Sequence, residues 1–507
     1  MSASAGRLAA LLLFSAASSV LAQPHFDVRI SPALTNAPAT GRLFVILSRS
    51  EKPEPRLTLT RTGLNAPFAF AEDVTNLAAG STYRFGDHLF GFPQQLTATP
   101  PGGYWVQALL DANTDLRLPD SPGNLYSAPQ AIHFDPQSSE FVKLELSRQI
   151  PPEQVPLDTA QIKYVRLQSK LLSDFFKRPM YLRAGIILPR DYDNEPGRKY
   201  PLWVRIGGFG TRYTAVGRMM SGFGEFHTVL QAADTPRFIL MLVDGAGPYG
   251  DPYYVNSANN GPYGDALVQE LIPFVEQKFR AMGEPRARVL SGVSTGGWVS
   301  LALQVFYPDF FNGTWSSCPD PVDFRAFELV NIYSNSDAYV NAYGNERPSE
   351  RDLKGDVVLT MRREVGVENL LGGGNSYTRS GQQWGSWDAV YSPRAADGGP
   401  APLWDAHTGR INPEVAEAWR KYDLRLLLEE NWATLGPKLR GKIHIASGEA
   451  DQYFLNNAAH LLNDFLTTAQ PPFEGRIVFS SGKGHGWSDV TLRQMLDEMH
   501  ALRCQSP

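Results

Sequence analysis

The sequence predicts an α/β protein: a parallel sheet covered by helices, interrupted by a cap-like insertion and preceded by a small all-β sandwich. Two patterns carry this prediction. Short strand-like runs separated by turn residues fill the first part of the chain, whereas strand-like and helical runs alternate in the rest. The length of 507 residues also exceeds one ordinary domain, which has roughly 100–200 residues.

The composition is that of a folded protein with a large core. Hydrophobic residues make up 43% of the chain and charged residues 20%, which argues against wholesale disorder. The formal net charge is −5 and no run of lysine and arginine occurs, so we expect no nucleic-acid partner. Two cysteines are too few for a disulfide framework or for a cysteine-ligated zinc or iron–sulfur site, and we expect no metal and no cofactor.

Residues 1–22 predict a secretory signal peptide. Arg7 supplies the positive charge, Leu8–Val20 is a run of apolar and small residues, and a small residue precedes the expected cleavage point. The apolar run is shorter than the roughly 20 residues that span a bilayer, so we expect no membrane anchor. The mature protein should therefore be secreted or periplasmic, and in that oxidising space Cys318 and Cys504 can form a disulfide.

Residues 23–150 predict the β-sandwich. Clusters of Pro, Gly, Asn and Asp separate its short β-rich runs, and no amphipathic helical stretch lies between them. The expected strands are Phe26–Ile30, Arg42–Ser48, Arg56–Thr60, Gly103–Leu110 and Phe141–Leu146. A stretch with two prolines at residues 150–153 reads as the linker to the second domain.

Residues 156–507 predict the α/β domain. Its first strand-like and helical runs are Tyr181–Leu188, Leu202–Ile206, Phe238–Val243, the helix Ala266–Phe279 and Ala287–Leu290. No clear period is present from about residue 325 to residue 437, which predicts the cap-like insertion. The alternation then resumes with Lys442–Ser447, the helix Asn456–Leu466, Arg476–Ser480 and the helix Val490–Leu502.

A serine motif lies between two of these runs. Gly292–Gly297 reads G-V-S-T-G-G, follows the strand-like Arg288–Leu290 and opens a helical run at Trp298. That context is specific for a nucleophile elbow, a tight strand-to-helix turn that lifts a serine above the carboxyl edge of a sheet. It predicts Ser294 as a nucleophile and the Thr295 N–H as an oxyanion donor. The alternative is an ordinary glycine-rich turn.

A serine nucleophile needs a base and an acid that orients the base. Of the nine histidines, His485 lies in a loop after the last predicted strand, where it can return over Ser294. The others lie in the β domain, before the acid or within helical runs. The acid should follow the strand Ile443–Ser447, where Glu449 and Asp451 are both candidates. Asp451 is favoured because it lies further past the strand end.

A second oxyanion donor is expected in the loop after the strand Leu202–Ile206. Glycines let backbone N–H groups approach a substrate oxygen, and we expect the Phe209 N–H as the donor, with Gly208 and Gly210 as neighbouring substrate contacts. Aromatic residues near the elbow, the histidine loop and the insertion are further candidate substrate contacts: Tyr254, Trp298, Trp384 and Trp487.

Several landmarks also carry a family resemblance. They are Glu270–Glu276, Gly292–Gly297, Tyr307–Phe311 and His485-Gly486-Trp487. With them the chain resembles the secreted esterases related to esterase D, the feruloyl esterases, the enterochelin esterases and the mycolyltransferases, over about Tyr181–Pro321 and Lys442–Leu502. The resemblance implies an α/β-hydrolase fold and a catalytic triad of Ser294, Asp451 and His485. A β-sandwich ahead of the catalytic domain is similar to the enterochelin-esterase arrangement.

Two departures from that family limit the resemblance. The usual His-Gly after the oxyanion strand is Gly207-Gly208 here, which leaves the second donor uncertain by one residue. The long insertion has no counterpart in simpler members, so a substrate is not implied.

The sequence therefore predicts a secreted serine esterase that hydrolyses a small-molecule or carbohydrate-linked carboxylic ester through an acyl-enzyme. Three alternatives stay open at this point. An acyltransferase would use the same triad, a peptidase would cleave amides with it, and a non-catalytic carbohydrate-binding protein would explain the β domain.

Overall fold

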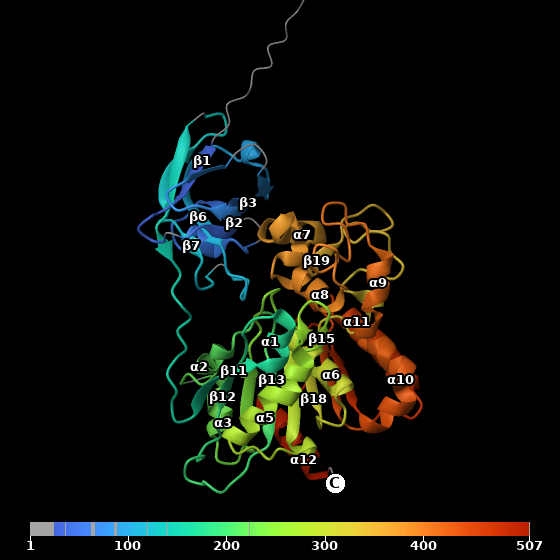
Figure 1. Ribbon diagram of the computed structural model, residues 1–507. Coiled ribbons are helices and arrows are strands. Elements are labelled where there is room, and N and C mark those ends of the chain that lie inside the picture. The colour runs from blue at the N-terminus through green and yellow to red at the C-terminus, as the bar shows by residue number, and fades with distance from the viewer. Residues whose placement is uncertain are drawn as a thin grey trace, which may run out of the picture.

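The computed structural model places the β-sandwich at one end of the molecule and the α/β domain at the other, with the insertion beside both (Figure 1). The structure describes residues 25–35, 37–61, 66–85, 89–118, 120–138, 140–222 and 224–505. The predicted signal peptide, residues 1–22, lies outside the described residues. Within the described residues, no helix is both long and apolar enough to cross a membrane.

The sandwich consists of two sheets. The smaller one has the order β4 (Thr82–Phe85), β1 (His25–Ile30), β9 (Phe141–Leu146). The larger one has the order β10 (Arg148–Gln149), β7 (Leu125–Tyr126), β6 (Gly102–Asp111), β2 (Ala39–Ser48), β3 (Phe68–Leu77), β5 (Phe90–Phe92), and β8 (Gln130–Phe134) also pairs with β6. One predicted strand is wrong: Arg56–Thr60 overlaps a 3-10 turn at Pro55–Thr58, because Pro55 opens a helical turn and cannot donate to a ladder.

Strand β2 is buried on both faces, and each face has a separate role. Leu43, Val45 and Leu47 pack between the two sheets. Phe44 and Ile46 alternate with them and pack instead against Leu370 of the insertion. The sandwich is therefore fixed to the insertion by an apolar contact.

A buried arginine of β2 adds a polar contact to the same junction. The Arg42 side chain donates to the carbonyl oxygens of Leu370 (2.7 Å) and Asn369 (3.4 Å) and to Oδ1 of Asn375 (2.7 Å). It also forms an ion pair with Asp73 of β3 at 2.9 Å.

The α/β domain is built on an eight-stranded sheet. Its order is β11 (Ile162–Ser169), β12 (Met180–Ile187), β14 (Ile239–Val243), β13 (Leu202–Ile206), β17 (Arg288–Val293), β18 (Thr314–Ser317), β21 (Ile443–Gly448), β22 (Arg476–Ser480). The pairs β11–β12 and β12–β14 are antiparallel, and every other neighbouring pair is parallel. This is an α/β-hydrolase sheet, which confirms the predicted fold class.

Helices cover both faces of the sheet. On one face, α5 (Ile272–Lys278), α6 (Thr295–Phe306) and α11 (Asn456–Thr468) contribute to the same core as Leu202, Val204 and Ile206 of β13. On the other face, α3 (Glu225–Gln231) and α12 (Leu492–Gln505) pack over Trp203. Adjacent residues of β13 thus contribute to opposite cores, as parallel strands covered on both faces do.

The insertion lies between β18 and β21. Its elements are β19 (Pro348–Arg351), β20 (Val357–Thr360), α7 (Met361–Leu371), α8 (Gln383–Tyr391), α9 (Pro413–Trp419) and α10 (Leu424–Lys438). Buried aromatic side chains fill it: Phe327, Trp384, Trp387, Trp404 and Trp419. Glu368 of α7 accepts the backbone N–H groups of Trp384 and Gly385, both at 2.9 Å, and so stabilises the first turn of α8.

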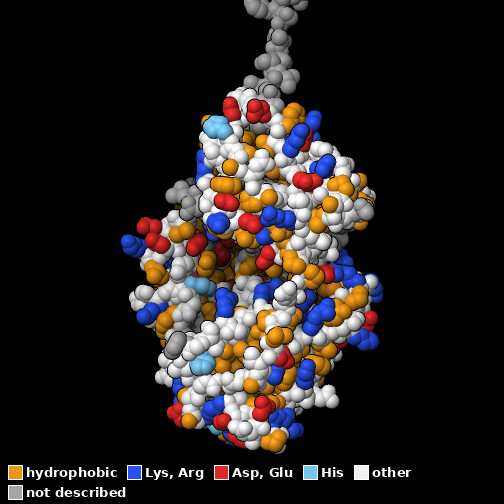
Figure 2. All heavy atoms as spheres, turned by 90° about the vertical axis from the view of Figure 1, so that its left-hand side faces the viewer, with side chains coloured by type: hydrophobic (Ala, Val, Ile, Leu, Met, Phe, Trp, Pro, Cys, Tyr) orange, Lys and Arg blue, Asp and Glu red, His pale blue; other side chains and the backbone are white. Residues whose placement is uncertain are grey.

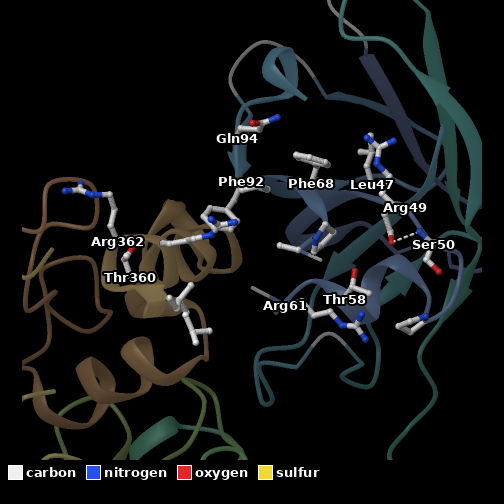
Figure 3. A pocket seen from close by; sticks show the side chains of 18 of the residues that line it. Leu47, Arg49, Ser50, Thr58, Arg61, Phe68, Phe92, Gln94, Thr360 and Arg362 are labelled. Atoms are coloured by element: carbon white, nitrogen blue, oxygen red, sulfur yellow. Dashed lines mark hydrogen bonds between the residues drawn. The ribbon is translucent and has the colours of Figure 1, made fainter. Parts of the chain in front are cut away.

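A groove of about 1110 Å³ separates the sandwich from part of the insertion. Figure 3 shows Arg49, Arg61 and Phe92 on the sandwich side and Arg362 on the insertion side. Lys52 and Arg363 also line this groove, and Glu346 is its only acidic lining residue among those that the structure describes. In Figure 2 the surface is hollowed where the sandwich meets the lower part of the molecule.

The two cysteines do not form the disulfide that the sequence allows. Cys318 is buried just after β18, whereas Cys504 is exposed near the end of α12, and both are free thiols. α12 runs back along the sheet, so that Leu502 lies beside Gly313, before β18 begins. The two sulfur atoms therefore lie near opposite ends of β18, too far apart to form a disulfide.

Candidate active site

Ser294 occupies a strained turn between β17 and α6. Its φ of 60° and ψ of −126° fall in a region that non-glycine residues rarely adopt. Glycines make the turn possible, because a Cβ on Gly292 would collide with the Gly296 carbonyl oxygen, and one on Gly296 would collide with the carbonyl oxygens of Ile206 and Gly207. The structure thus has the geometry of a nucleophile elbow.

His485 and Asp451 lie together beyond the ends of β22 and β21. The distance between His485 Nδ1 and Asp451 Oδ2 is 2.9 Å, and the Asp451 side chain is fully buried. The other carboxylate oxygen of Asp451 accepts the Tyr453 N–H at 2.9 Å, and the His485 N–H donates to Gln452 Oε1 at 2.6 Å. These bonds fix both the carboxylate and the histidine loop.

Glu449, the other acidic candidate, is directed elsewhere. Its carboxylate lies 3.0 Å from Nε2 of His460 on α11. Both Glu449 and His460 are therefore engaged with each other, and the structure pairs Asp451 with His485 instead.

Ser294 and His485 line the same cavity, of about 340 Å³. Phe209, the expected second oxyanion residue, lines it as well. Thr295 is the first residue of α6, where backbone N–H groups have no intrahelical partner and can bind a negative oxygen. The Gly210 N–H is already used, since it donates to Asp251 Oδ2 at 3.1 Å.

The predicted aromatic contacts do not line this cavity. Tyr254, Trp298 and Trp384 are each at most 2% exposed and belong to the core, and the Tyr254 hydroxyl donates to the Asp244 carbonyl oxygen. Trp487 is half-buried in the histidine loop but also lies outside the lining, as do Gly208 and Gly210. Trp387 and Tyr453 are the aromatic residues, besides Phe209, that line it.

Asp320 is a site residue that the sequence reasoning missed. The Ser294 hydroxyl donates to Asp320 Oδ1 at 3.3 Å. Tyr253 (2.7 Å), Thr295 (2.9 Å) and Gln383 (3.0 Å) all donate side-chain hydrogen bonds to Asp320 Oδ2. Burial raises the pKa of Asp320, and the hydrogen bonds from Tyr253, Thr295 and Ser294 oppose that rise. Its position directly after β18, the strand next to the elbow strand, was the available signal.

Three glutamates, Glu328, Glu364 and Glu368, line the same cavity as Asp320. Burial raises the pKa of Glu328 well above its ordinary value, raises that of Glu364, and raises that of Glu368 to about 8. No lysine or arginine lines the cavity among the residues that the structure describes. The described lining of the cavity thus contains four acidic side chains and no basic one.

One group of side chains could in principle hold a metal ion. Cys318, Asp451 and His485 bring one ligand atom each within 4.8 Å of one another. Burial raises the pKa of the Cys318 thiol to about 11, and a thiol must lose its proton to bind a metal. Asp451 and His485 are already bonded to each other, so this arrangement favours acid–base chemistry over metal binding.

Comparisons with solved structures give matches at low sequence identity and low TM-score. A ferulic acid esterase is 16% identical over 68% of this chain and 99% of its own, with a TM-score of 0.38. An S-formylglutathione hydrolase from Agrobacterium tumefaciens is 13% identical over 69% and 97%, also with a TM-score of 0.38. FphF, a fluorophosphonate-binding serine hydrolase from Staphylococcus aureus, is 15% identical over 67% and 96%, with a TM-score of 0.37. No curated protein sequence matches the chain in a direct sequence search.

A family model gives the decisive match. The model described as "Putative esterase" matches residues 176–485, which is more than half of the chain and includes Ser294, Asp451 and His485. The protein therefore belongs to this esterase family and is a carboxylic ester hydrolase.

Proposed function

We propose that the protein hydrolyses esters through an acyl-enzyme on Ser294, with His485 as general base and Asp451 as the residue that orients it. The observation that carries this proposal is the juxtaposition in one cavity of a serine on a strained elbow and an imidazole bound to a buried carboxylate. A serine hydroxyl is a weak nucleophile until a positioned base accepts its proton.

The first half of the reaction acylates the enzyme. Ser294 Oγ attacks the ester carbonyl carbon while His485 Nε2 accepts the hydroxyl proton. The carbonyl oxygen becomes an oxyanion, for which the backbone N–H groups of Thr295 and Phe209 are the donors. His485 then gives the proton to the departing alcohol, and the acyl group stays on Ser294.

The second half releases the acid. Water enters the cavity, gives a proton to His485 and attacks the acyl carbon, and Ser294 leaves with that proton. The Asp451 carboxylate, 2.9 Å from Nδ1, keeps the imidazole in the tautomer that accepts at Nε2 and stabilises the imidazolium in both halves.

Asp320 gives the resting serine a second hydrogen-bond partner. Ser294 donates to Asp320 in this structure, so the hydroxyl must turn toward His485 before it reacts. We propose that substrate binding in the cavity favours this turn, because a carbonyl group placed against the oxyanion donors occupies the space beside Asp320.

Replacement of the nucleophile tests the mechanism. Ser294→Ala should fold normally, lose reaction with a fluorophosphonate probe and lower the turnover of p-nitrophenyl acetate by about a million-fold. Ser221→Ala, which changes an exposed serine bonded to the Arg218 carbonyl oxygen, should retain both activities. Labelling or turnover that persists in Ser294→Ala would remove the proposed mechanism.

We also propose that residues 1–22 direct export and are removed before Gln23. The supporting observation is the charged, apolar and small-residue order of this segment. Expression of the full chain with its own leader, followed by N-terminal sequencing of the periplasmic fraction, should give a chain that starts at Gln23. An intact Met1 on exported or retained protein would contradict this.

A further inference from the structure

The catalytic cavity has an acidic wall, which we define as Asp320, Glu328 and Glu364. These carboxylates come from three separate segments: the loop after β18, the first part of the insertion, and α7. Glu368, the fourth acidic lining residue, does not belong to this group, because the backbone N–H groups of Trp384 and Gly385 bind its two oxygens. Both oxygens of Asp320 also accept hydrogen bonds, whereas Glu328 Oε2 has no partner among the described residues, so Glu328 is the member of the wall with acceptor capacity to spare.

Glu328 is the unsatisfied member of the wall. Its side chain is only 4% exposed, and its Oε2 has no hydrogen-bond partner among the described residues. No ion pair involves it in the described part of the chain either. A buried carboxylate without a partner is costly, so a residue of this kind that faces a cavity indicates a missing ligand group.

The spread of the wall indicates the size of that group. Among described residues, only Cys318, Asp451 and His485 bring three ligand atoms within 4.8 Å of one another, so the wall does not converge on one small ion. A larger organic cation can contact carboxylates that lie further apart. The aromatic side chains of Trp387 and Tyr453 line the same cavity, and aromatic rings attract organic cations.

We infer that the cavity beside Ser294 binds a cationic substituent of the ester substrate, an organic ammonium or guanidinium group, through Asp320, Glu328 and Glu364. The inference rests on the proposed function, since it assigns a substrate class to that site. The cation places the ester within reach of Ser294, and the acidic wall rejects esters that carry a carboxylate or phosphate.

Binding of a cation in this cavity should release protons to the buffer. Burial raises the pKa of Glu328 well above its ordinary value, and the negative charges of Glu364, Asp320, Asp451 and Glu350 raise it further, so all of them favour the protonated form. A cation lowers that pKa and expels the proton to the buffer. A neutral, hydroxyl-rich ligand would instead bind the protonated carboxyl groups as they are and release no proton.

Matched ester pairs test the inference on the active protein. On the alcohol side, acetylcholine is compared with its carbon isostere 3,3-dimethylbutyl acetate. On the acyl side, p-nitrophenyl 4-(trimethylammonio)butanoate is compared with p-nitrophenyl 5,5-dimethylhexanoate. In at least one pair the cationic ester should have a kcat/KM about tenfold or more above that of its isostere, and added salt should reduce this ratio.

Substitutions locate the effect. Glu328→Gln and Glu364→Gln should each lower the ratio of kcat/KM for the cationic ester to kcat/KM for its isostere by about tenfold. Glu474→Gln removes an exposed carboxylate at the opposite edge of the sheet and is the control for net charge, with no expected effect. If Glu328→Gln fails to fold, the Glu364→Gln variant and the salt dependence of the native protein decide the question.

Binding without turnover separates this inference from the proposed mechanism. Calorimetry on Ser294→Ala in two buffers of different ionisation enthalpy should show tighter binding of the cationic ester and release of protons. Equal affinity within both pairs, or a preference with no proton release, overturns the inference even where esters are still hydrolysed. Tighter cation binding by a protein with no Ser294-dependent hydrolysis would support the cavity assignment and reject the proposed function.

Discussion

Two hollows of the described structure differ in both size and charge. The groove between sandwich and insertion, about 1110 Å³, is lined by five cationic side chains and one carboxylate: Arg49, Lys52, Arg61, Arg362, Arg363 and Glu346. The catalytic cavity, about 340 Å³, is lined by four carboxylates and by no lysine or arginine among the described residues. The strained serine opens onto the smaller hollow, so size alone does not identify the site.

Helix α7 contributes basic residues to the groove and acidic residues to the cavity. In α7, Glu364 and Glu368 are four residues apart and therefore share a face, which is turned to the catalytic cavity. Arg362 and Arg363 come just before them and line the groove instead. Because α7 places its glutamates in the cavity and its arginines in the groove, we predict that substitutions in the groove do not change how the cavity binds a charged substrate.

The largest expected effect is confined to the catalytic cavity and compares two histidine–carboxylate pairs. His485→Gln should lower kcat by about a million-fold, because it removes the base that activates Ser294. His460→Gln removes a histidine of α11 that is paired with Glu449 and does not line the cavity. Turnover of this variant should stay within about twofold of the native value. Steady-state kinetics with p-nitrophenyl acetate measures both, and similar losses in the two variants would contradict the assignment of His485.

The next effect concerns the stability of the insertion that separates the hollows. Burial raises the pKa of Asp388 in α8 to about 8, from an ordinary value near 3.8. Between about pH 4 and pH 8 the folded state therefore holds a proton that the unfolded chain has released. The free energy of unfolding should fall as pH rises through this window, and the contribution of Asp388 is fully present below it.

Thermal unfolding followed by circular dichroism checks this pH dependence. The melting temperature should drop by about 5 °C between pH 5 and pH 8, and Asp388→Asn, which carries no titrating proton, should reduce the drop. Asp397→Asn, an exposed carboxylate of the same insertion, is the control. A melting temperature that rises with pH over this range would show that other groups dominate.

A smaller effect is expected from Asp320. Asp320→Asn keeps one acceptor oxygen for Ser294 but places an amide where Tyr253, Thr295 and Gln383 all donate. We expect about a tenfold loss of kcat and an altered pH profile of kcat, since the nucleophile then lies beside a group that does not titrate. A loss of folded protein with an unchanged pH profile in the remaining active fraction would indicate a purely structural role.

The smallest effect should come from the groove. Lys52→Glu and Arg61→Glu reverse two exposed charges there. Because no groove residue also lines the catalytic cavity, kcat/KM for the cationic and neutral esters should change by less than about twofold. Larger changes with one ester of a pair would show that the groove and the cavity act together on the substrate.

The elbow and the parallel strands could be predicted because their signals are local. Residues 292–297 carry their own turn chemistry, and strands buried on both faces read as continuous apolar runs. β11 was missed because it is an edge strand with several half-buried and exposed positions, so its apolar pattern is weak. Arg56–Thr60 has β-rich composition, but Pro55 just before it opens a 3-10 turn.

The acidic wall as a whole could not be predicted, since it is assembled by contacts between distant segments. Glu328 and Glu364 lie in the insertion, whose packing depends on tryptophans spaced without a period. Aromatic composition there is equally compatible with a substrate rim and with a core. The structure buries both Trp384 and Trp387, and of the two only Trp387 also lines the cavity.

The bonds of Arg42 have a consequence for how this enzyme can be divided or rebuilt. The guanidinium holds the end of the helix that carries Glu364, and Thr60 from the same sandwich reaches the catalytic cavity. An excised hydrolase module would lose one side of its substrate chamber and leave two carbonyl groups exposed. We therefore expect an α/β domain transplanted without the sandwich to fold but to lose part of its esterase activity.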